Sequence, residues 1–333
     1  MSAHPAAPSP VIDFHCHMLE KSVFKASTNK TVFTGFGANP VSAPRPGAQQ
    51  LLARMYDPLA IIEDMDARGI DMSVVTASTV LQGSSWADPQ QDLELCQRCN
   101  EQATRWTTDH PTRLIGSFVL PLQDVDLALA ELDRCVNQLH LKVANVSSSY
   151  NGVYVGDPIY HPFWAQIERY GITTWIHPEG VGDPWFQNYA LWNSLGQSIE
   201  ETKCMTSLVY EGVMTKFPAL KVVMAHGGGY FPHYMGRLDR NTLNRPDTVR
   251  NTGGRSPSDF LRSFYYDTCV YDPEVLKVLA ERVGVDRLVM GSDYPVGEAD
   301  PVGWLKSAGI EGEELRQVSG GTAAGLLGIG TLS

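Results

Sequence analysis

Short apolar runs rich in β-branched residues alternate along the chain with longer stretches in which apolar residues recur every three or four positions. The short runs have the length and composition of buried strands, and the longer stretches have the period of amphipathic helices. Eight strands are predicted, at residues 11–17, 72–77, 114–120, 141–145, 173–177, 221–226, 264–267 and 288–293. This order predicts repeated βα units on a parallel sheet.

Eight strands with helical connections and a helical tail at residues 313–328 predict a closed (β/α)8 TIM barrel. An open doubly wound sheet would more often carry a Gly-rich turn after its first strand, and this sequence has none there. Residues 18–56 are rich in Gly, Pro, Ser and Thr without a clear period, so we expect a long insertion between the first strand and the first barrel helix, over the barrel mouth. A second insertion is expected at residues 179–198.

Composition restricts the class of protein. A barrel accommodates all 333 residues in one domain, and residues 1–10 are expected to be a disordered tail. A formal charge of -11 leaves no basic stripe for nucleic acid. No apolar run is long enough to cross a membrane. Without a signal-peptide pattern, and with six scattered cysteines, the sequence favours reduced thiols and a cytoplasmic location.

The first predicted strand ends in two histidines, His15 and His17, separated by one residue. Alternation along a strand points both imidazoles to one side, and it points Ile12 and Phe14 to the other. Active sites of TIM barrels lie at the C-terminal ends of the strands, which is where this pair falls. We therefore favour metal ligands over satisfied core histidines for the pair.

Three further polar residues fall at predicted strand ends, namely His177, His226 and Asp293. Four histidines and a carboxylate on one face form a ligand set for zinc, manganese or iron, with room for a bound water or substrate. The alternative is that these residues only cap strand ends in solvent. It is disfavoured because all five fall at the same predicted end of the barrel.

Four motifs together resemble the amidohydrolase superfamily, in particular the branch of aminocarboxymuconate semialdehyde decarboxylase. They are IDFHCH on the first strand, IHPE on the fifth, AHGGGYFPHYMGR on the sixth and GSDYP on the eighth. The resemblance implies one divalent ion held by His15, His17, His177 and Asp293, with His226 close by but not bound to it. The expected ion is Zn²⁺, with Mn²⁺ as the alternative.

The resemblance also implies the chemistry. The expected reaction is non-oxidative decarboxylation of a small unsaturated, phenolic or semialdehyde carboxylic acid, with His226 or Asp293 moving the proton. A hydrolase or hydratase, acting on a lactone or oxalomesaconate, would use the same site. Superfamily members with two metals bridge them with a lysine near the end of the fourth strand. Here the only lysine of that strand, Lys142, lies near its start, which favours one metal.

The residues expected to bind substrate match the family pattern only in part. Arg237 matches a family arginine that reaches the substrate from a neighbouring subunit, which implies a homodimer; the alternative is a surface ion pair with Asp239. A second family arginine is replaced by Gln49, and Arg45 or Arg54 is the candidate to substitute for it. Trp185, in the second insertion, is expected to line the site.

Overall fold

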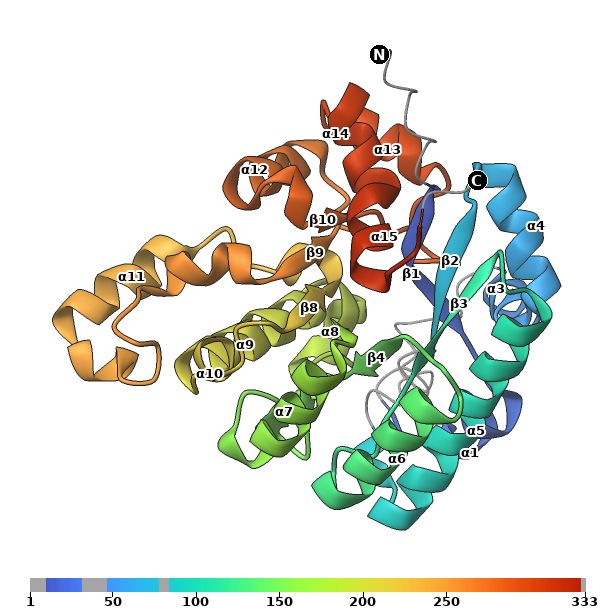
Figure 1. Ribbon diagram of the computed structural model, residues 1–333, viewed down its shortest axis with the longest axis horizontal. Helices are drawn as coiled ribbons and strands as arrows, with labels where there is room; N and C mark the ends of the chain where they lie inside the picture. Colours follow the sequence, from blue (N-terminus) through green and yellow to red (C-terminus); the bar gives the residue numbers. More distant parts are fainter. Residues whose placement is uncertain (1–9, 32–46, 78–83, 331–333) are drawn as a thin grey trace, which may run out of the picture.

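The computed structural model describes residues 10–31, 47–77 and 84–330 and contains an eight-stranded parallel sheet (Figure 1). The strands follow the order β1-β2-β3-β4-β7-β8-β9-β10. Their bounds are β1 (Ile12–Met18), β2 (Met72–Ala77), β3 (Leu114–Phe118), β4 (Val143–Val146), β7 (Thr173–Ile176), β8 (Lys221–Met224), β9 (Tyr265–Asp267) and β10 (Leu288–Val289). Each corresponds to one of the eight predicted strands.

The sheet closes on itself between its first and last strands. The backbone N–H of Phe14 donates to the carbonyl of Met290 at 2.8 Å, and that of His17 donates to the carbonyl of Tyr294 at 3.0 Å. Cys16 and Tyr294 form a parallel bridge at the same seam. The predicted TIM barrel is therefore confirmed.

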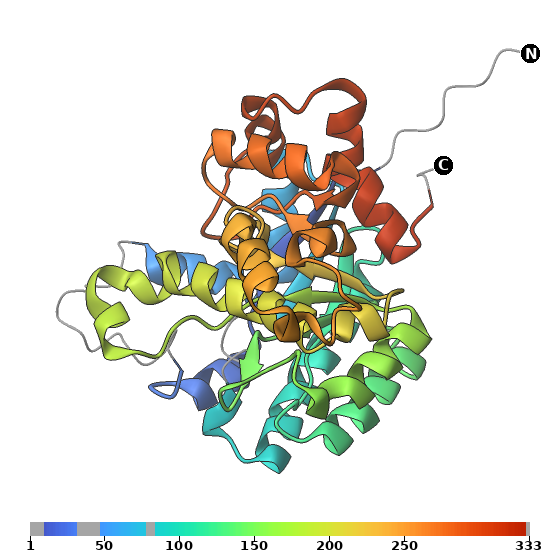
Figure 2. The ribbon, with the colours of Figure 1, turned by 90° about the vertical axis from the view of Figure 1, so that its left-hand side faces the viewer.

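Helices surround the strands in both views (Figures 1 and 2). They are α4 (Pro58–Arg68), α5 (Pro89–Asp109), α6 (Val125–Asn137), α7 (His161–Tyr170), α9 (Gly196–Tyr210), α10 (Val213–Lys216), α11 (Met235–Asn244), α12 (Pro273–Val283), α13 (Pro301–Ser307), α14 (Gly312–Arg316) and α15 (Thr322–Leu327). Within the described ranges, no helix has both the length and the apolar character needed to span a bilayer.

Local sequence explains where several of these helices begin and end. Asp57 and Asp272 accept hydrogen bonds from backbone N–H groups at the starts of α4 and α12, and a proline follows each of them. Gly69 and Gly171 end α4 and α7 in the left-handed conformation. These signals set the alternation of strand and helix that the barrel requires.

Both insertions contain short elements that the sequence pattern does not predict. The first carries α1 (Lys21–Ser27) and α3 (Ala48–Arg54), and the second carries the 3-10 segment η4 (Pro184–Ala190) and α8 (Leu191–Ser194). A hairpin of β5 (Ser149–Tyr150) and β6 (Val153–Tyr154) follows β4. Its Asn151-Gly152 turn is a strong hairpin signal that the strand prediction missed. The expected tail lies, apart from Pro10, outside the described residues.

Strand β1 corrects the prediction of simple alternation. The pairing with β2 shifts register between Asp13 and Cys16, as in a β-bulge. Ile12 and Phe14 join the buried cluster that contains Trp175, and the ring of His15 lies 4.7 Å from that same tryptophan. The prediction that Ile12 and Phe14 point away from the histidines was therefore wrong, because the bulge brings both kinds of side chain into the barrel.

A buried polar network joins α5 to α6. The carboxylate of Glu131 accepts hydrogen bonds from Asn100 at 2.7 Å and from Arg134 at 2.8 and 2.9 Å. The Asn100 side chain also binds both backbone groups of Val119, just after β3. Burial raises the pKa of Glu131, but the hydrogen bonds from Arg134 and Asn100 outweigh it and leave the pKa below its ordinary value. Ionised Glu131 thus ties two helices to the barrel.

Glu131→Gln is expected to lower the free energy of unfolding by about 1.5–3 kcal/mol at pH 7, since the hydrogen bonds it weakens involve a charged group. The folded-state pKa lies below the ordinary value of 4.5. The ionised form therefore stabilises the fold above pH 4.5, and its contribution is lost as the pH falls through the folded-state pKa. Denaturant unfolding at several pH values measures the difference between variant and wild type, which should shrink in acid.

The matched control is Glu101→Gln, because Glu101 contacts the same Arg134 at 3.5 Å but is half exposed. Exposed ion pairs contribute little, so this change should stay within about 1 kcal/mol. An equal loss in both variants, or a difference that does not vary with pH, would contradict the role given to Glu131.

Candidate metal centre

The structure brings the five predicted polar side chains together at one end of the barrel. His15 and His17 lie near the end of β1, His177 follows β7, His226 follows β8 and Asp293 lies beyond β10. The ring of His15 lies 5.2 Å from both His177 and His226, measured between centroids. Residues far apart in sequence therefore share one polar cluster, as strand ends of a barrel do.

Three donor atoms of the cluster form a tight triangle. The Nε2 atoms of His15 and His17 are 3.1 Å apart. Oδ1 of Asp293 lies 3.3 Å from Nε2 of His15 and 3.2 Å from Nε2 of His17. A nitrogen of His177 lies within 4.8 Å of the donor atoms of both other histidines.

These separations fit a divalent metal ion. Two ligand atoms that are each about 2.1 Å from an ion, at tetrahedral or octahedral angles, lie roughly 3.0–3.4 Å apart. The three measured distances fall in this range. Imidazole nitrogens with a carboxylate oxygen are also a donor set that such ions prefer. The cluster can therefore hold a divalent metal ion.

The protonation states favoured at His17, His177 and Asp293 suit metal ligands. At His15, burial lowers the pKa, but the charges of Cys269 and Asp293 and the hydrogen bond to Asp267 outweigh it and raise the pKa well above its ordinary value, so an ion bound there would displace a proton. Burial lowers the pKa of His17 and of His177, and the neighbouring imidazoles His226 and His15 lower that of His177 further. Burial raises the pKa of Asp293, but the charge and hydrogen bonds of the His15 and His17 imidazoles outweigh it and place the pKa well below its ordinary value. Neutral imidazoles and an ionised carboxylate are the forms that bind a metal.

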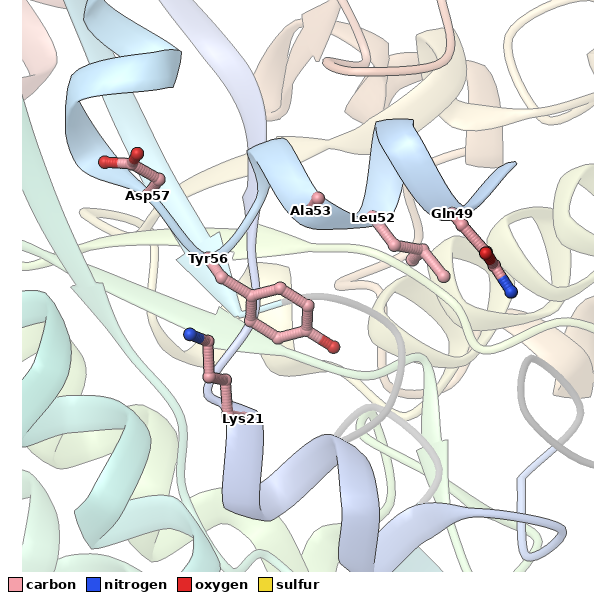
Figure 3. A pocket seen from close by; sticks show the side chains of 6 residues that line it. All are labelled: Lys21, Gln49, Leu52, Ala53, Tyr56 and Asp57. Carbon is pink, nitrogen blue, oxygen red and sulfur yellow. The ribbon is translucent and has the colours of Figure 1, made fainter. Parts of the chain in front are cut away.

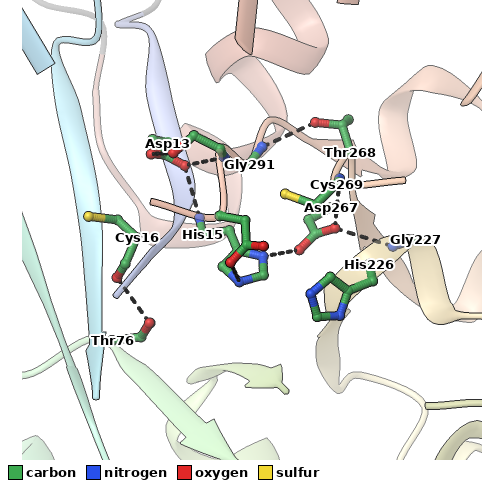
Figure 4. Close-up of polar contacts among 12 residues, drawn as sticks. Asp13, His15, Cys16, Thr76, His226, Gly227, Asp267, Thr268, Cys269 and Gly291 are labelled. Atoms are coloured by element: carbon green, nitrogen blue, oxygen red, sulfur yellow. Dashed lines mark hydrogen bonds and ion pairs between the residues drawn. The ribbon is translucent and has the colours of Figure 1, made fainter. Parts of the chain in front are cut away.

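Asp267, at the end of β9, holds His15 in place (Figure 4). Its Oδ2 atom accepts a hydrogen bond from Nδ1 of His15 at 2.7 Å. Its Oδ1 atom accepts from the backbone N–H groups of Gly227 at 3.2 Å and Cys269 at 3.1 Å. A carboxylate on Nδ1 fixes the ring and leaves Nε2 for the metal, as is usual for metal-binding histidines.

His226 is supported by Glu201, a residue that the sequence analysis missed. Oε1 of Glu201, which lies on α9 and is fully buried, is 2.5 Å from Nδ1 of His226. Burial raises the pKa of Glu201 to about 7. Burial lowers the pKa of His226, but the charge of Glu201 outweighs it and raises the pKa above its ordinary value. With Nδ1 engaged, Nε2 is the nitrogen that can exchange a proton with a ligand.

A signal for Glu201 is present in the sequence. Along α9 the buried positions include Gln197, Glu201, Met205 and Leu208, which recur every three or four residues. A carboxylate within such a buried stripe requires a partner, because an unpaired buried charge is very costly. The pattern could have identified Glu201 as a site residue, although it could not have identified His226 as its partner.

Comparison with known proteins supports the arrangement. The family model described as "Amidohydrolase" matches residues 12–329. The chain belongs to the amidohydrolase family. It is 31% identical to a 2-amino-3-carboxymuconate-6-semialdehyde decarboxylase of Dictyostelium discoideum over 285 residues, which cover 84% of this chain and 79% of that protein.

Two solved structures show the same fold as this amidohydrolase. The 5-carboxyvanillate decarboxylase of Sphingomonas paucimobilis is 25% identical, with a TM-score of 0.84 over 96% of this chain and 99% of that one. A dihydroxybenzoic acid decarboxylase of Polaromonas, with bound manganese and 2-nitroresorcinol, is 23% identical, with a TM-score of 0.84 over 96% of this chain and 97% of that one.

In this amidohydrolase, a cavity of about 530 Å³ opens beside the candidate metal centre. His226, Asp293 and Tyr271 line it on the barrel side, and α9 contributes Gln197. The residues that line it also include Asn193, Ser194, Ser198, Gly229, Tyr230, His233, Cys269, Val270 and Val275. This lining contains neither lysine nor arginine, so within the described residues of one chain no fixed cation faces a substrate carboxylate there.

The structure does not bring the other predicted substrate residues to this cavity. Arg54 lies on α3, where its guanidinium contacts Asp64 at 2.6 Å and Glu63 at 3.0 Å. Trp185 is 59% exposed on η4 and stacks edge-on against Phe186. Neither side chain is part of the cavity lining.

Gln49 and Arg237 also lie away from the cavity of their own chain. Gln49 lines a separate pocket of about 590 Å³ together with Lys21 and Tyr56 (Figure 3). Arg237 is exposed on α11, a helix that lies at the periphery of the molecule (Figure 1). Asp239, its predicted alternative partner, accepts a hydrogen bond from the backbone of Ser258 at 3.1 Å. Arg45 lies outside the described residues.

Proposed function

We propose that this amidohydrolase is a metal-dependent, non-oxidative decarboxylase of a small aromatic or unsaturated carboxylic acid. The observation that carries the proposal is the placement of a donor cluster for one ion next to His226, whose Nδ1 is held by Glu201, at the edge of a 530 Å³ cavity. The likeness to a semialdehyde decarboxylase over most of both chains supports the same reaction class.

His15, His17, His177 and Asp293 would hold the ion, which we propose to be Zn²⁺, with Mn²⁺ as the alternative. Imidazole and carboxylate are both ligands of zinc, and an ion with five or six ligands would still have room for a substrate atom. Such an ion supplies Lewis-acid stabilisation to an oxygen of the bound acid. Asp267 and Glu201 contact Nδ1 of His15 and of His226 in the same way, and His226 also lies within reach of the donor atoms of His15 and Asp293. The role of proton carrier is assigned to His226 because its side chain lines the cavity, whereas His15 does not.

His226 would perform the proton transfer. The charge of Glu201 raises the pKa of His226 above its ordinary value, which favours the protonated imidazole that a general acid requires. Nε2 gives its proton to the carbon that bears the carboxylate, and the bond from that carbon to the carboxylate then breaks. A π-electron pair of the acid forms the new carbon–hydrogen bond, and the electron pair of the broken carbon–carboxylate bond then restores the π system as carbon dioxide leaves. A hydrogen thus replaces the carboxylate without any external oxidant or reductant. Proton exchange with water then restores the imidazolium, and Glu201 keeps it oriented.

We further propose a homodimer in which Arg237 completes the partner's site. A substrate carboxylate needs a cation, and among the described residues of one chain the cavity lining contains no lysine or arginine. Residues 237–250 carry four exposed arginines (Arg237, Arg240, Arg245 and Arg250) on a protein of net charge -11, so this segment is complementary to the acidic remainder of a second copy. Leu243 on the same segment and Tyr234 just before it are both exposed and offer apolar contact.

Arg237→Ala is expected to raise KM by about 10–100-fold, the effect of losing a hydrogen-bonded charge pair, and to change kcat less. Initial rates over a range of substrate concentrations provide this test. Arg240→Ala removes the same charge from the same helix and is the matched control, with KM expected to stay within about twofold. Equal effects in both variants, or full activity in a protein that is monomeric by light scattering, would contradict the shared site.

The reaction class is tested with substrates labelled with carbon-13 in the carboxylate. The panel should contain dihydroxybenzoates, 5-carboxyvanillate, a carboxymuconate semialdehyde and lactones. The proposal predicts labelled carbon dioxide in a one-to-one ratio with consumed acid for at least one member. Hydrated or ring-opened products without gas would favour a hydrolase or hydratase instead.

A further inference from the structure

Tyr271 makes a contact with Asp293 that the mechanism above does not use. Its hydroxyl donates to Oδ2 of Asp293 at 2.6 Å. The other oxygen of the same carboxylate, Oδ1, is the one that faces the imidazoles of His15 and His17. The two carboxylate oxygens therefore have separate roles: one lies in the donor triangle and the other is held by a phenol.

The surrounding backbone is arranged to allow this contact. Tyr271 lies in the loop after β9 with a φ of 55°, a left-handed conformation that costs an ordinary residue of the order of 1–3 kcal/mol. A Cβ atom added to Gly297 would first meet the backbone carbonyl oxygen of Ser292, and it would also lie 2.7 Å from the Tyr271 hydroxyl and 2.7 Å from Cβ of Asp293. The absence of a side chain at residue 297 thus leaves the space in which the phenol reaches the carboxylate.

We propose that Tyr271 is a positioning residue that fixes the Asp293 carboxylate with Oδ1 directed at the metal. This inference rests on the proposed function, because it assumes that Asp293 is a ligand. A carboxylate can rotate about its last bond, and it can bind an ion through one oxygen or two. The hydrogen bond to Oδ2 favours one rotation and occupies the second oxygen, so less orientational freedom is lost when the ion binds.

The cavity provides a matched comparison in Tyr230. Tyr230 also lines the cavity and is similarly exposed, at 43% against 48% for Tyr271. Its backbone N–H donates to the hydroxyl of Thr202 at 2.9 Å. A phenol-to-phenyl change at Tyr230 therefore removes an equivalent hydroxyl from the same cavity without touching Asp293.

Tyr271→Phe should weaken Zn²⁺ or Mn²⁺ binding by about 10–100-fold, the usual effect of removing an outer partner of a metal ligand. The measurement is competition for the ion against a chromophoric chelator, with wild type, Tyr271→Phe and Tyr230→Phe compared in parallel. Tyr230→Phe should bind the ion within about twofold of wild type. Because the readout is ion affinity, the test does not depend on finding a substrate.

Thermal unfolding distinguishes positioning from a general structural role. The hydroxyl of Tyr271 is part of a half-exposed side chain, so Tyr271→Phe should leave the Tm of the metal-free protein unchanged. The rise in Tm on adding the ion should be smaller than in wild type, because stabilisation by a ligand follows its affinity. A lower Tm in the metal-free state with unchanged affinity would show a structural role and overturn the proposal.

The outcomes also separate this inference from the function on which it rests. If wild type binds no divalent ion at the cluster, the proposed metal centre fails, and the positioning role fails with it. If wild type binds the ion and Tyr271→Phe binds it equally well, only the positioning role is overturned. Equal weakening in Tyr271→Phe and Tyr230→Phe would likewise overturn it, since the effect would then belong to the cavity as a whole.

Discussion

Replacing His226 with asparagine is expected to lower kcat by about 10²- to 10⁴-fold, the range typical of losing a general acid. An asparagine amide can still donate a hydrogen bond toward Glu201, but it cannot deliver a proton at neutral pH. The four proposed ligands remain in place, so the bound metal should stay at the wild-type level. Steady-state rates give kcat, and elemental analysis of the same preparation gives the metal content.

His233→Asn is the control for His226→Asn, because His233 also lines the cavity and its replacement removes an imidazole of the same size. Burial lowers the pKa of His233, and the charge of Arg282 lowers it further, so it is a poor proton donor at neutral pH. Its loss should reduce kcat by less than about tenfold. An equally large loss in both variants, or a loss of metal from His226→Asn, would contradict the role of His226 as the proton carrier.

Asp293→Asn should have the second large effect, because it exchanges a charged ligand for a neutral amide of nearly the same shape. Metal affinity is expected to fall by more than the roughly 10–100-fold caused by losing an outer partner. Without the ion, kcat should fall by about 10³-fold or more, since metal ions contribute several kcal/mol to the stabilisation of transition-state charge. Metal content after dialysis and the initial rate on re-addition of the ion measure the two losses.

The control for Asp293→Asn is Asp300→Asn, at the exposed cap of α13. Asparagine caps helices about as well as aspartate, so this change should alter neither metal content nor rate. Retention of the metal by Asp293→Asn, with full activity, would remove Asp293 from the proposed ligand set.

The fold was predictable because its signals are local. Most strands are short apolar runs that contain β-branched residues, and helices such as α4 and α12 start at Asp-Pro pairs and end near a glycine. The end of β1 was not fully predictable. Its bulge accompanies hydrogen bonds between Phe14 and Met290 and between His17 and Tyr294, pairs that are more than 270 residues apart in sequence. Alternation within seven residues carries no information about that seam.

Only part of the candidate site was predictable, namely the residues at the ends of the predicted strands. Histidines and an aspartate at strand ends converge because the barrel places all strand ends together. Glu201 and Tyr271 lie on a helix and in a loop, and only the folded chain shows that they meet His226 and Asp293. Strand periodicity contains no such information.

The substrate residues were the least predictable, because they lie in the insertions. Arg54 matched a role by its approximate position in the sequence, but its guanidinium is held by Asp64, which also accepts a hydrogen bond from Tyr294 at 2.8 Å. That network ties α3 to α4 and to the loop after β10. Trp185 follows a turn capped by Asp183, and its ring lies outside the cavity. Polar contacts within the insertions therefore fix where the side chains of Arg54 and Trp185 lie.

The central claim is that catalysis depends on one divalent ion at the cluster of His15, His17, His177 and Asp293. It is tested most directly by removing metal with a chelator, titrating Zn²⁺ or Mn²⁺ back, and measuring bound ion per chain and carbon dioxide release in the same samples. The account predicts no gas from the metal-free protein and release that rises in proportion to occupancy up to one ion per chain. Undiminished gas release without metal, or release that does not follow occupancy, would contradict it.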